Sequence, residues 1–170
     1  AAGPLVISDA FDYSENRLAL NWQWNHNPDN SLWSVTERPG WLRLVTGSPA
    51  RSVEYARNTL TQRTEGPACS GMTLMEFAHM KPGDRAGLVA LQHVYGTVGI
   101  HAGDDGAHRV AMCVRGEDGL EEVIEKIRYN GDRIWLKIDF DFRDGADLAR
   151  FSYSEDGTEW RAIGRTLQLK

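Results

Sequence analysis

The stretch Ile134-Trp135-Leu136-Lys137-Ile138-Asp139-Phe140-Asp141-Phe142 carries the clearest structural signal in the chain. Successive side chains of an extended strand point to opposite faces. Apolar residues at every second position are therefore typical of a strand with one buried face. The apolar set is Ile134, Leu136, Ile138, Phe140 and Phe142, and the polar set is Lys137, Asp139 and Asp141. We predict a half-buried β-strand here.

Similar short segments recur along the rest of the chain. The 17 glycines and 6 prolines lie between these segments and do not gather in one linker. One Asp-Gly pair, in Glu155-Asp156-Gly157, is typical of a hairpin turn between two strands. Strands are predicted at residues 41–45, 72–77, 86–94, 109–114, 148–154 and 158–163.

One segment conflicts with this pattern. Its apolar residues have helical spacing: Leu120, Val123, Ile124 and Ile127. The interval between Gly119 and Gly131 is barely long enough for an isolated helix, however, and its neighbours are strand-like. We therefore predict a strand. Many short strands separated by turn signals indicate an all-β sandwich, with residues 1–170 as a single domain.

Composition narrows the classes of partner. The chain has 170 residues, and its 24 acidic and 19 basic residues give a net charge of −5, which argues against a nucleic-acid partner. No apolar run is long enough to predict a transmembrane segment or a membrane partner. Cys69 and Cys113 fit buried thiols better than a disulfide. The localisation stays open between cytoplasmic and secreted or periplasmic, because the first residues could follow a cleaved signal, a tag or an upstream domain.

No catalytic motif is recognisable. The acidic residues lie mainly in turns or on polar strand faces, where solvated charge is the simplest interpretation. A glycosidase needs two facing carboxyl groups, and the strand at residues 134–142 places Asp139 and Asp141 on one face. Both also fit a solvated outer face. No catalytic residue is therefore predicted within this chain.

Two segments are unusually polar for strands of a dry core. In the first, Trp22 and Trp24 alternate with Gln23 and Asn25 before His26. Aromatic planes bordered by amide and imidazole groups suit a carbohydrate-binding surface. For each tryptophan taken alone, however, a core position is favoured, because large aromatic side chains are highly buried on average.

The second polar segment covers residues 56–64 and places polar side chains on both faces of one strand. Such a strand suits a groove or a domain interface better than the space between two sheets. We predict that the two segments form one carbohydrate-binding or domain-interface surface, with Trp24 as its aromatic platform. Its residues are Gln23, Trp24, Asn25, His26, Asn58 and Gln62.

These segments also carry a family resemblance. Gln23-Trp24-Asn25-His26-Asn27-Pro28-Asp29, Thr36-Glu37-Arg38-Pro39-Gly40-Trp41 and Ala56-Arg57-Asn58-Thr59-Leu60-Thr61-Gln62-Arg63-Thr64 resemble, in order and spacing, the C-terminal domain of family 43 glycoside hydrolases. The opening Asp9-Ala10-Phe11-Asp12 and the hairpin Tyr153-Ser154-Glu155-Asp156-Gly157-Thr158-Glu159-Trp160 fit the same family. The similarity extends over nearly the whole chain.

The resemblance implies a concanavalin A-like jelly-roll β-sandwich attached behind a catalytic β-propeller. Enzymes of this β-xylosidase and α-L-arabinofuranosidase type act on xylo-oligosaccharides and arabinoxylans. The expected function is thus a non-catalytic accessory domain whose partners are the propeller and a xylan-type oligosaccharide. The alternative is a free-standing carbohydrate-binding module for xylan-type glycans. A third hypothesis is a sandwich that is itself a glycosidase.

Two further expectations come from the family. Its members continue with β-structure beyond the segment that matches residues 163–168, so the last strands are expected to be missing from this chain or supplied from elsewhere. An open sheet edge would otherwise favour pairing or aggregation. Similar sandwiches hold a structural calcium ion, for which Asp9 is the predicted ligand here, because Ca²⁺ prefers carboxylate and backbone oxygens. A turn-capping role for Asp9 is the alternative.

Overall fold

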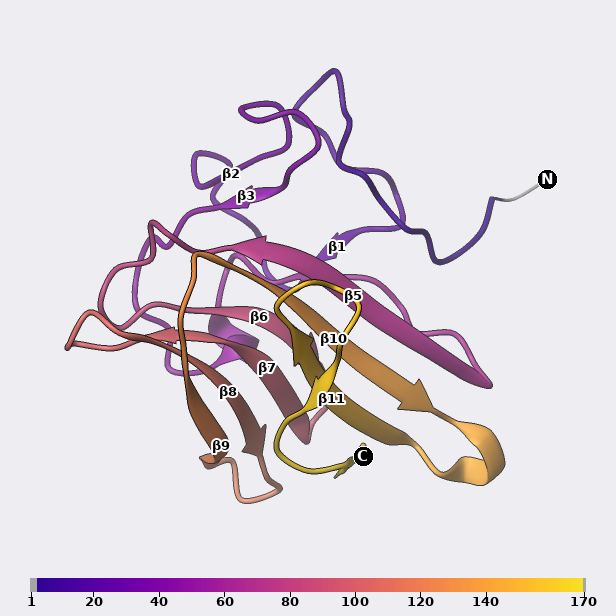
Figure 1. The fold of residues 1–170 in the computed structure, drawn as a ribbon. Helices are drawn as coiled ribbons and strands as arrows, with labels where there is room; N and C mark the ends of the chain where they lie inside the picture. The colour runs from indigo at the N-terminus through magenta and orange to yellow at the C-terminus, as the bar shows by residue number, and fades with distance from the viewer. Residues whose placement is uncertain (1–2, 170) are drawn as a thin grey trace. The chain divides into compact units, whose positions relative to one another are not determined.

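The computed structural model describes residues 3–169 and contains strands, turns and two short 3-10 helices (Figure 1). The chain divides into two compact units, Ala1–Glu65 and Gly66–Lys170. Within the part of the chain that the structure describes, no helix combines the length and apolar character needed to cross a bilayer.

The first unit is held together by two short antiparallel ribbons. Strand β1 (Gln23–Trp24) pairs with β4 (Leu60–Thr61), and β2 (Trp33–Ser34) pairs with β3 (Arg43–Leu44). A 3-10 helix, η1 (Val53–Tyr55), lies between β3 and β4. Turns and loops make up most of the remaining backbone, so side-chain hydrogen bonds carry much of the local order.

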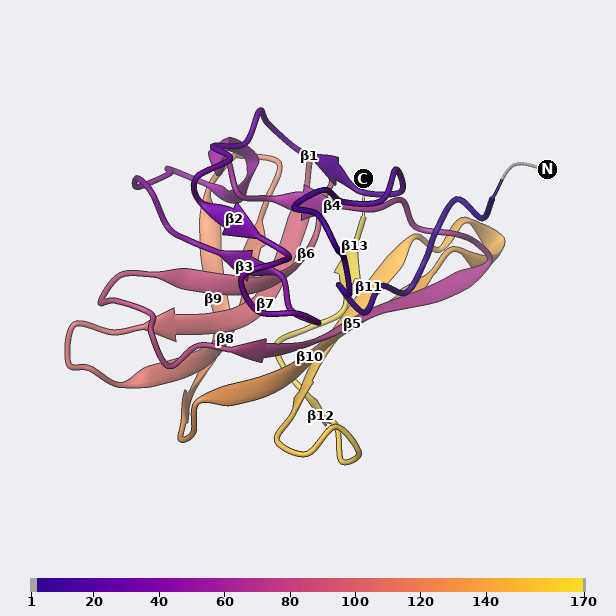
Figure 2. The same ribbon diagram turned by 90° about the horizontal axis from the view of Figure 1, so that it is seen from above.

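The second unit contains two antiparallel sheets, which Figures 1 and 2 show stacked face to face. The first sheet has the order β12-β11-β10-β5, and β13 also pairs with β11. Its strands are β5 (Ala68–Glu76), β10 (Arg133–Asp141), β11 (Leu148–Ser154), β12 (Arg161–Ala162) and β13 (Leu167–Gln168). The second sheet has the order β6-β7-β8-β9. Its strands are β6 (Arg85–Ala90), β7 (Tyr95–Ala102), β8 (His108–Arg115) and β9 (Glu121–Tyr129).

The hydrophobic core of the second unit gathers side chains from both sheets, and β10 supplies its centre. Ile134, Leu136 and Ile138 are almost completely buried, as the alternating pattern predicts. Other members of the cluster include Val98, Ile100, Val110, Met112, Ala149, Phe151 and Leu167. The all-β sandwich is thus confirmed. A second short 3-10 helix, η2 (Arg143–Gly145), follows β10.

Strand β7 is missing from the sequence-based prediction, which extends the preceding strand to residue 94. Strand β6 in fact ends at Ala90. The sequence does not predict β7 because the strand contains glycines, and glycine has a low intrinsic preference for strands. They are required by packing: a Cβ built on Gly96 would lie 2.5 Å from Phe151 Cζ, and one on Gly99 would lie 2.1 Å from the carbonyl oxygen of Ala86.

The segment with helical spacing is the edge strand β9, so the prediction of a strand there is confirmed. Met112 pairs with Glu125 whereas Cys113 pairs with Val123, so a bulge at Ile124 interrupts the register. A bulge inserts one extra residue into a strand and shifts the alternation of its side chains. The bulge therefore explains why Val123 and Ile124 resemble a helical pair.

The hairpin predicted at the Asp-Gly pair is confirmed, because β11 pairs with β12 in antiparallel orientation. Its second strand is shorter than the predicted residues 158–163 and contains only Arg161 and Ala162. Asp156 Oδ1 accepts hydrogen bonds from the backbone N–H groups of Thr158 and Glu159, which stabilises a longer connection. Trp33, Trp41 and Trp160 lie in hydrophobic strand patterns, which predict core positions, but all three are half-buried.

Both cysteines are free thiols, as the sequence favours. Cys113 is completely buried in β8, and Cys69 is half-buried in β5. Burial raises the pKa of the Cys113 thiol, and the charge of Glu121 adds to this. A buried thiol with a raised pKa is poorly nucleophilic, which fits a packing role.

Candidate functional site

The β1–β4 ribbon brings together the two polar segments that the sequence singles out. Gln23 lies opposite Thr61 and Trp24 opposite Leu60. The ribbon is extended by a hydrogen bond of 2.9 Å from the Asn25 backbone N–H to the carbonyl oxygen of Thr59. Thr61 Oγ1 donates a further bond of 2.9 Å to the carbonyl oxygen of Gln23. The predicted proximity of residues 22–30 and 56–64 therefore holds at the level of the backbone.

Beyond β1 the chain is fixed by one carbonyl group of η1. Asn25 Nδ2 donates to the carbonyl oxygen of Glu54 at 2.9 Å, and His26 Nε2 contacts the same oxygen. Because a carbonyl oxygen only accepts hydrogen bonds, His26 Nε2 is the donor in this contact. Both side chains are exposed apart from these contacts.

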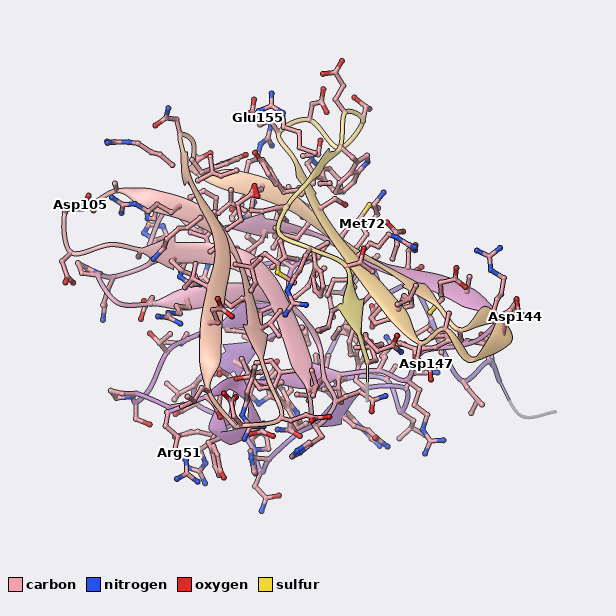
Figure 3. All side chains as sticks on the ribbon, turned by 90° about the horizontal axis from the view of Figure 1, so that it is seen from below. Arg51, Met72, Asp105, Asp144, Asp147 and Glu155 are labelled. Carbon is pink, nitrogen blue, oxygen red and sulfur yellow. The ribbon has the colours of Figure 1, made fainter. Side chains whose placement is uncertain are left out.

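A stack of three side chains forms next to these residues. The rings of His26 and Tyr55 are stacked with centroids 6.4 Å apart and an angle of 13° between their planes. The guanidinium carbon of Arg51 lies 3.7 Å from the centroid of the Tyr55 ring (Arg51 is labelled in Figure 3). Tyr55 is 49% exposed. We call His26, Tyr55 and Arg51 the aromatic stack. Sequence reasoning missed Tyr55 and Arg51 because η1 and its flanking turns carry no periodic pattern.

Trp24 is neither a core residue nor a free platform. Its ring packs against Trp33, with centroids 5.3 Å apart and an angle of 51° between the planes. Trp33 is held in turn by a hydrogen bond of 2.9 Å from its Nε1 to Asn30 Oδ1. Trp22, Trp24 and Trp33 line a shallow hollow of about 410 Å³ together with residues 16–20 and Gln23. One side of Trp24 thus borders the surface while the other packs within the unit.

Gln62 and Asn58 occupy different environments from the rest of the predicted set. Gln62 Oε1 accepts a hydrogen bond of 3.1 Å from the Ile7 backbone N–H, and Gln62 Nε2 donates one of 3.1 Å to the Ile7 carbonyl oxygen. This pair of bonds attaches the N-terminal segment to β4 in the way a neighbouring strand would. Asn58 is a half-buried turn residue just before the ribbon.

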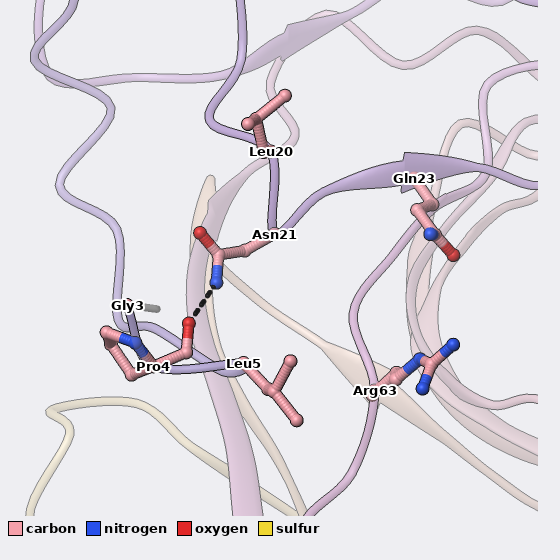
Figure 4. Close-up of a pocket in the computed structure, with 7 residues that line it drawn as sticks. All are labelled: Gly3, Pro4, Leu5, Leu20, Asn21, Gln23 and Arg63. Atoms are coloured by element: carbon pink, nitrogen blue, oxygen red, sulfur yellow. Dashed lines mark hydrogen bonds between the residues drawn. The ribbon is translucent and has the colours of Figure 1, made fainter. Parts of the chain in front are cut away.

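A second hollow, of about 470 Å³, also borders β1 and shares Leu20 and Gln23 with the first (Figure 4). Its lining residues are Gly3, Pro4, Leu5, Leu20, Asn21, Gln23 and Arg63. We call it the N-terminal hollow. Leu5 and Leu20 are missed by the sequence analysis because single leucines in loops give no periodic signal.

Asp9 is surrounded by hydrogen-bond donors. Its Oδ1 accepts a bond of 2.8 Å from the Phe11 backbone N–H, and its Oδ2 accepts one of 2.8 Å from Trp22 Nε1 and another from the Tyr13 hydroxyl. Burial alone would raise the pKa of the Asp9 carboxyl group, but these three hydrogen bonds outweigh burial and lower it. Asp9 therefore ties the opening turn to β1 as an ionised acceptor.

These neighbours do not fit a calcium site. Ca²⁺ needs several oxygen ligands around it, whereas the groups that face Asp9 are N–H and O–H donors. No group of three or more His, Cys, Asp or Glu side chains suited to a metal ion occurs among the described residues. Calcium binding at Asp9 stays a prediction. It is checked by comparing the melting temperature in excess calcium and in chelator, where an unchanged temperature removes the site.

The paired acids of β10 lie beside cations. Asp139 contacts Ser70 Oγ, and its Oδ2 lies 3.7 Å from Lys137 Nζ. Asp141 accepts two hydrogen bonds from the Arg143 guanidinium, at 2.9 and 2.7 Å, and these hold the pKa of its carboxyl group well below the usual range. A general acid of a glycosidase needs a raised pKa instead.

Other acids of the second unit project from separate loops. Figure 3 shows Asp105, Asp144 and Glu155 at loops that lie far apart around the two sheets. Asp105 is paired with Arg109, whose Nη2 lies 2.6 Å from Asp105 Oδ2. These acids do not form the facing pair that glycoside hydrolysis requires.

Comparison with known proteins identifies the domain. The family described as the β-xylosidase C-terminal concanavalin A-like domain matches residues 8–170. The chain belongs to this family. The expectations of a family 43 C-terminal domain and of a concanavalin A-like β-sandwich are therefore confirmed.

Two curated relatives show how much of a longer protein the domain represents. It is 32% identical over 162 residues to a putative β-xylosidase of Xylanibacter ruminicola, covering 93% of this chain and 27% of that protein. It is 30% identical over 181 residues to a β-xylosidase of Formosa agariphila, covering 93% of this chain and 29% of that protein. The chain thus spans less than a third of the length of these relatives.

Two solved structures share the fold. A bifunctional GH43-CE protein of Bacteroides eggerthii superposes with a TM-score of 0.90 at 44% identity, covering 95% of this chain and 21% of that one. A family 43 glycoside hydrolase, engineered to display both endo-xylanase and exo-arabinofuranosidase activity, gives a TM-score of 0.86 at 27% identity. That match covers 100% of this chain and 35% of the other.

Proposed function

We propose that this domain is the non-catalytic accessory domain of a xylan- or arabinoxylan-degrading family 43 glycoside hydrolase. In this role it packs on the catalytic β-propeller and helps to shape recognition of the substrate. One observation carries the proposal: the domain family covers residues 8–170, whereas the same chain covers only 27% and 29% of two β-xylosidases that it resembles. A domain of this kind is part of a larger protein in its relatives.

The surroundings of the acidic residues support a non-catalytic role. Asp141 is ionised and bound by Arg143, so it is unsuited to donating a proton. Asp139 Oδ2 lies 3.7 Å from Lys137 Nζ, so this carboxyl group is paired with a cation as well. Hydrolysis is therefore assigned to carboxylates outside this chain.

The aromatic stack supports a role in recognition. Sugars present C–H faces that pack on aromatic rings and hydroxyl groups that hydrogen-bond to polar side chains. Tyr55 is 49% exposed, and the exposed His26 ring, with its second ring nitrogen unused by the Glu54 contact, is stacked on it. Asn25 and His26 are both anchored on the Glu54 carbonyl oxygen, so the surface is ordered before a sugar binds.

The first test is the composition of the gene and the activity of the isolated domain. A reading frame for a β-propeller is expected immediately upstream of this domain. The purified 170-residue chain should not hydrolyse aryl xylosides or arabinofuranosides. Turnover by the isolated chain that Asp139→Asn abolishes would overturn the non-catalytic assignment.

The second test concerns recognition in the complete enzyme. His26→Ala and Tyr55→Ala should reduce kcat/KM for xylo-oligosaccharides several-fold, while kcat/KM for an aryl xyloside stays unchanged because its short glycone reaches only the catalytic domain. Arg133→Ala, an exposed change in the second unit, is the control. If the variants of the aromatic stack change kcat/KM for both substrates by the same factor, the stack does not contribute to recognition of the xylo-oligosaccharide.

The alternative function is a free-standing carbohydrate-binding module for xylan-type glycans. The exposed aromatic stack favours it, since such a surface requires no second domain. In this case the isolated chain binds xylo-oligosaccharides in calorimetric titrations, and His26→Ala weakens binding. No heat of binding for the isolated chain, together with a propeller encoded upstream, excludes this alternative.

A further inference from the structure

We propose that the N-terminal hollow is the surface on which the upstream catalytic domain docks. The inference rests on the proposed function and adds to it the location of the interface and the chemistry of the partner surface. The partner contributes an apolar projection or patch that covers Leu5 and Leu20, and a carboxylate that pairs with Arg63.

The hollow has an ordered floor between two loops. Asn21 Nδ2 donates a hydrogen bond of 2.7 Å to the carbonyl oxygen of Pro4 and so joins the N-terminal segment to the loop before β1 (Figure 4). Gln62 fixes the same segment further along through Ile7. The two loops are thus held at a defined separation, and a partner would not have to organise them.

Two large aliphatic side chains stand exposed at its rim. Leu20 is 91% exposed and Leu5 is 74% exposed. Single exposed leucines are common on protein surfaces, but two that border one hollow of about 470 Å³ form an apolar patch with a concave centre. Such a patch is typical of a surface that another protein surface covers.

Arg63 supplies the polar part of the surface. Its side chain is exposed at the end of the ribbon, and it forms no ion pair within residues 3–169. In Figure 4 its guanidinium group lies next to the Gln23 amide at the edge of the hollow. An arginine beside exposed leucines matches the usual composition of interfaces, in which Arg is enriched and binds carboxylates in a bidentate manner.

The path of the chain identifies the occupant. The family is a C-terminal domain by description, and the relatives are more than three times as long as the matched segment. In a protein of this arrangement the preceding domain connects through Gly3, Pro4 and Leu5, which themselves line the hollow. The preceding domain is therefore tethered at the rim and reaches this surface at a high effective concentration.

The experiment uses the protein encoded by the whole gene, with a specific protease site inserted before residue 1. After cleavage, dilution and size-exclusion chromatography measure how strongly the two parts stay associated. Leu20→Asp and Arg63→Glu should each weaken the association at least tenfold, because one buries a charge in an apolar contact and the other reverses an ion pair. Both residues are exposed, so melting temperatures of the variants should match the wild type.

Leu120→Asp is the matched control. Leu120 is 70% exposed, precedes β9 in the second unit and is not among the residues that line the hollow, so the same change is made at an exposed leucine outside the proposed surface. Association that is equally strong in all three variants overturns the docking surface but leaves the accessory function intact. Wild-type parts that separate at once, or a gene without a propeller, overturn the proposed function itself. Intact association with weakened xylo-oligosaccharide binding in Leu20→Asp would make the hollow a glycan site and also overturn docking.

Discussion

Gln62 shows how far the sequence specifies the role of a single residue. Alternation predicts its position on a polar strand face, whereas β4 ends one residue earlier, at Thr61. Alternation also does not reveal that both polar atoms of the amide are bonded to the backbone of Ile7, because that contact joins residues 55 positions apart. The sequence therefore locates polar residues better than it separates structural residues from binding residues.

This distinction leads to a prediction for Gln62. Gln62→Ala removes one donor and one acceptor from the Ile7 backbone and should lower the free energy of unfolding by about 1–3 kcal/mol. Gln62→Glu keeps the acceptor for the Ile7 N–H but loses the donor, so its loss should be intermediate. Gln23→Ala, at an exposed side chain of the same unit, is the control. Urea denaturation measures the free energy of unfolding of all three variants. If Gln62→Ala has the same free energy of unfolding as the wild type, the two hydrogen bonds to Ile7 do not contribute to stability.

Asp9 gives a pH-dependent prediction. The hydrogen bonds from Tyr13, Trp22 and Phe11 lower the folded-state pKa below the ordinary 3.8 despite burial. A lowered pKa stabilises the fold above the unfolded-state pKa, and this stability is lost as the pH falls through the folded-state value.

Asp9→Asn should therefore lower the free energy of unfolding at neutral pH. As the pH falls below 3.8, the free energy of unfolding of this variant should decrease less than that of the wild type. Urea midpoints measured across this range provide the test. Asp12→Asn removes an exposed carboxyl group of the same segment and is the control for the change of charge itself. Parallel profiles for wild type and Asp9→Asn would contradict the proposed role of the carboxylate.

Among the elements, predictability depends on whether the local pattern and the packing agree. β10 and β11 follow simple alternation and appear at almost the predicted bounds. β7 does not, because its glycines are selected by contacts with other strands and not by the strand itself. β9 has a bulge whose cause lies in its pairing with β8. Long-range contacts of this kind leave no readable period in the local sequence.

The close packing of β7 can be tested with two glycines. Gly96→Ala places a methyl group 2.5 Å from Phe151 Cζ and 2.9 Å from Leu167 Cδ2, so it should destabilise the protein by about 1–3 kcal/mol. Gly71→Ala in β5 meets no atom within 4 Å and should be neutral, or stabilising by about 0.4–1 kcal/mol. Thermal and urea unfolding compare the two. Equal effects would show that β7 can shift to accommodate a side chain.

At the scale of the whole molecule, regular structure is unevenly distributed. The second unit contains both sheets of the sandwich and its core, with strands of up to nine residues. The first unit contains two ribbons of two-residue strands, and hydrogen bonds of side chains such as Asp9, Asn25 and Gln62 fix the loops around β1 and β4. The prediction of one domain over residues 1–170 therefore depends on whether the two units unfold together.

Hydrogen exchange can decide between one cooperative domain and two. Amides of β7, β8 and β10 should exchange most slowly, because these strands have partners on both sides and carry buried core residues.

If the units unfold independently, amides of β1 and β4 exchange faster, with a lower free energy of opening, and Gln62→Ala accelerates them without affecting β10. If the chain is one domain, the slowest amides of both units share the global free energy of unfolding, and Gln62→Ala lowers both by the same amount. Mass-spectrometric exchange on the wild type and this variant distinguishes the outcomes, since only independent units allow the effect of Gln62→Ala to stay within residues 3–65.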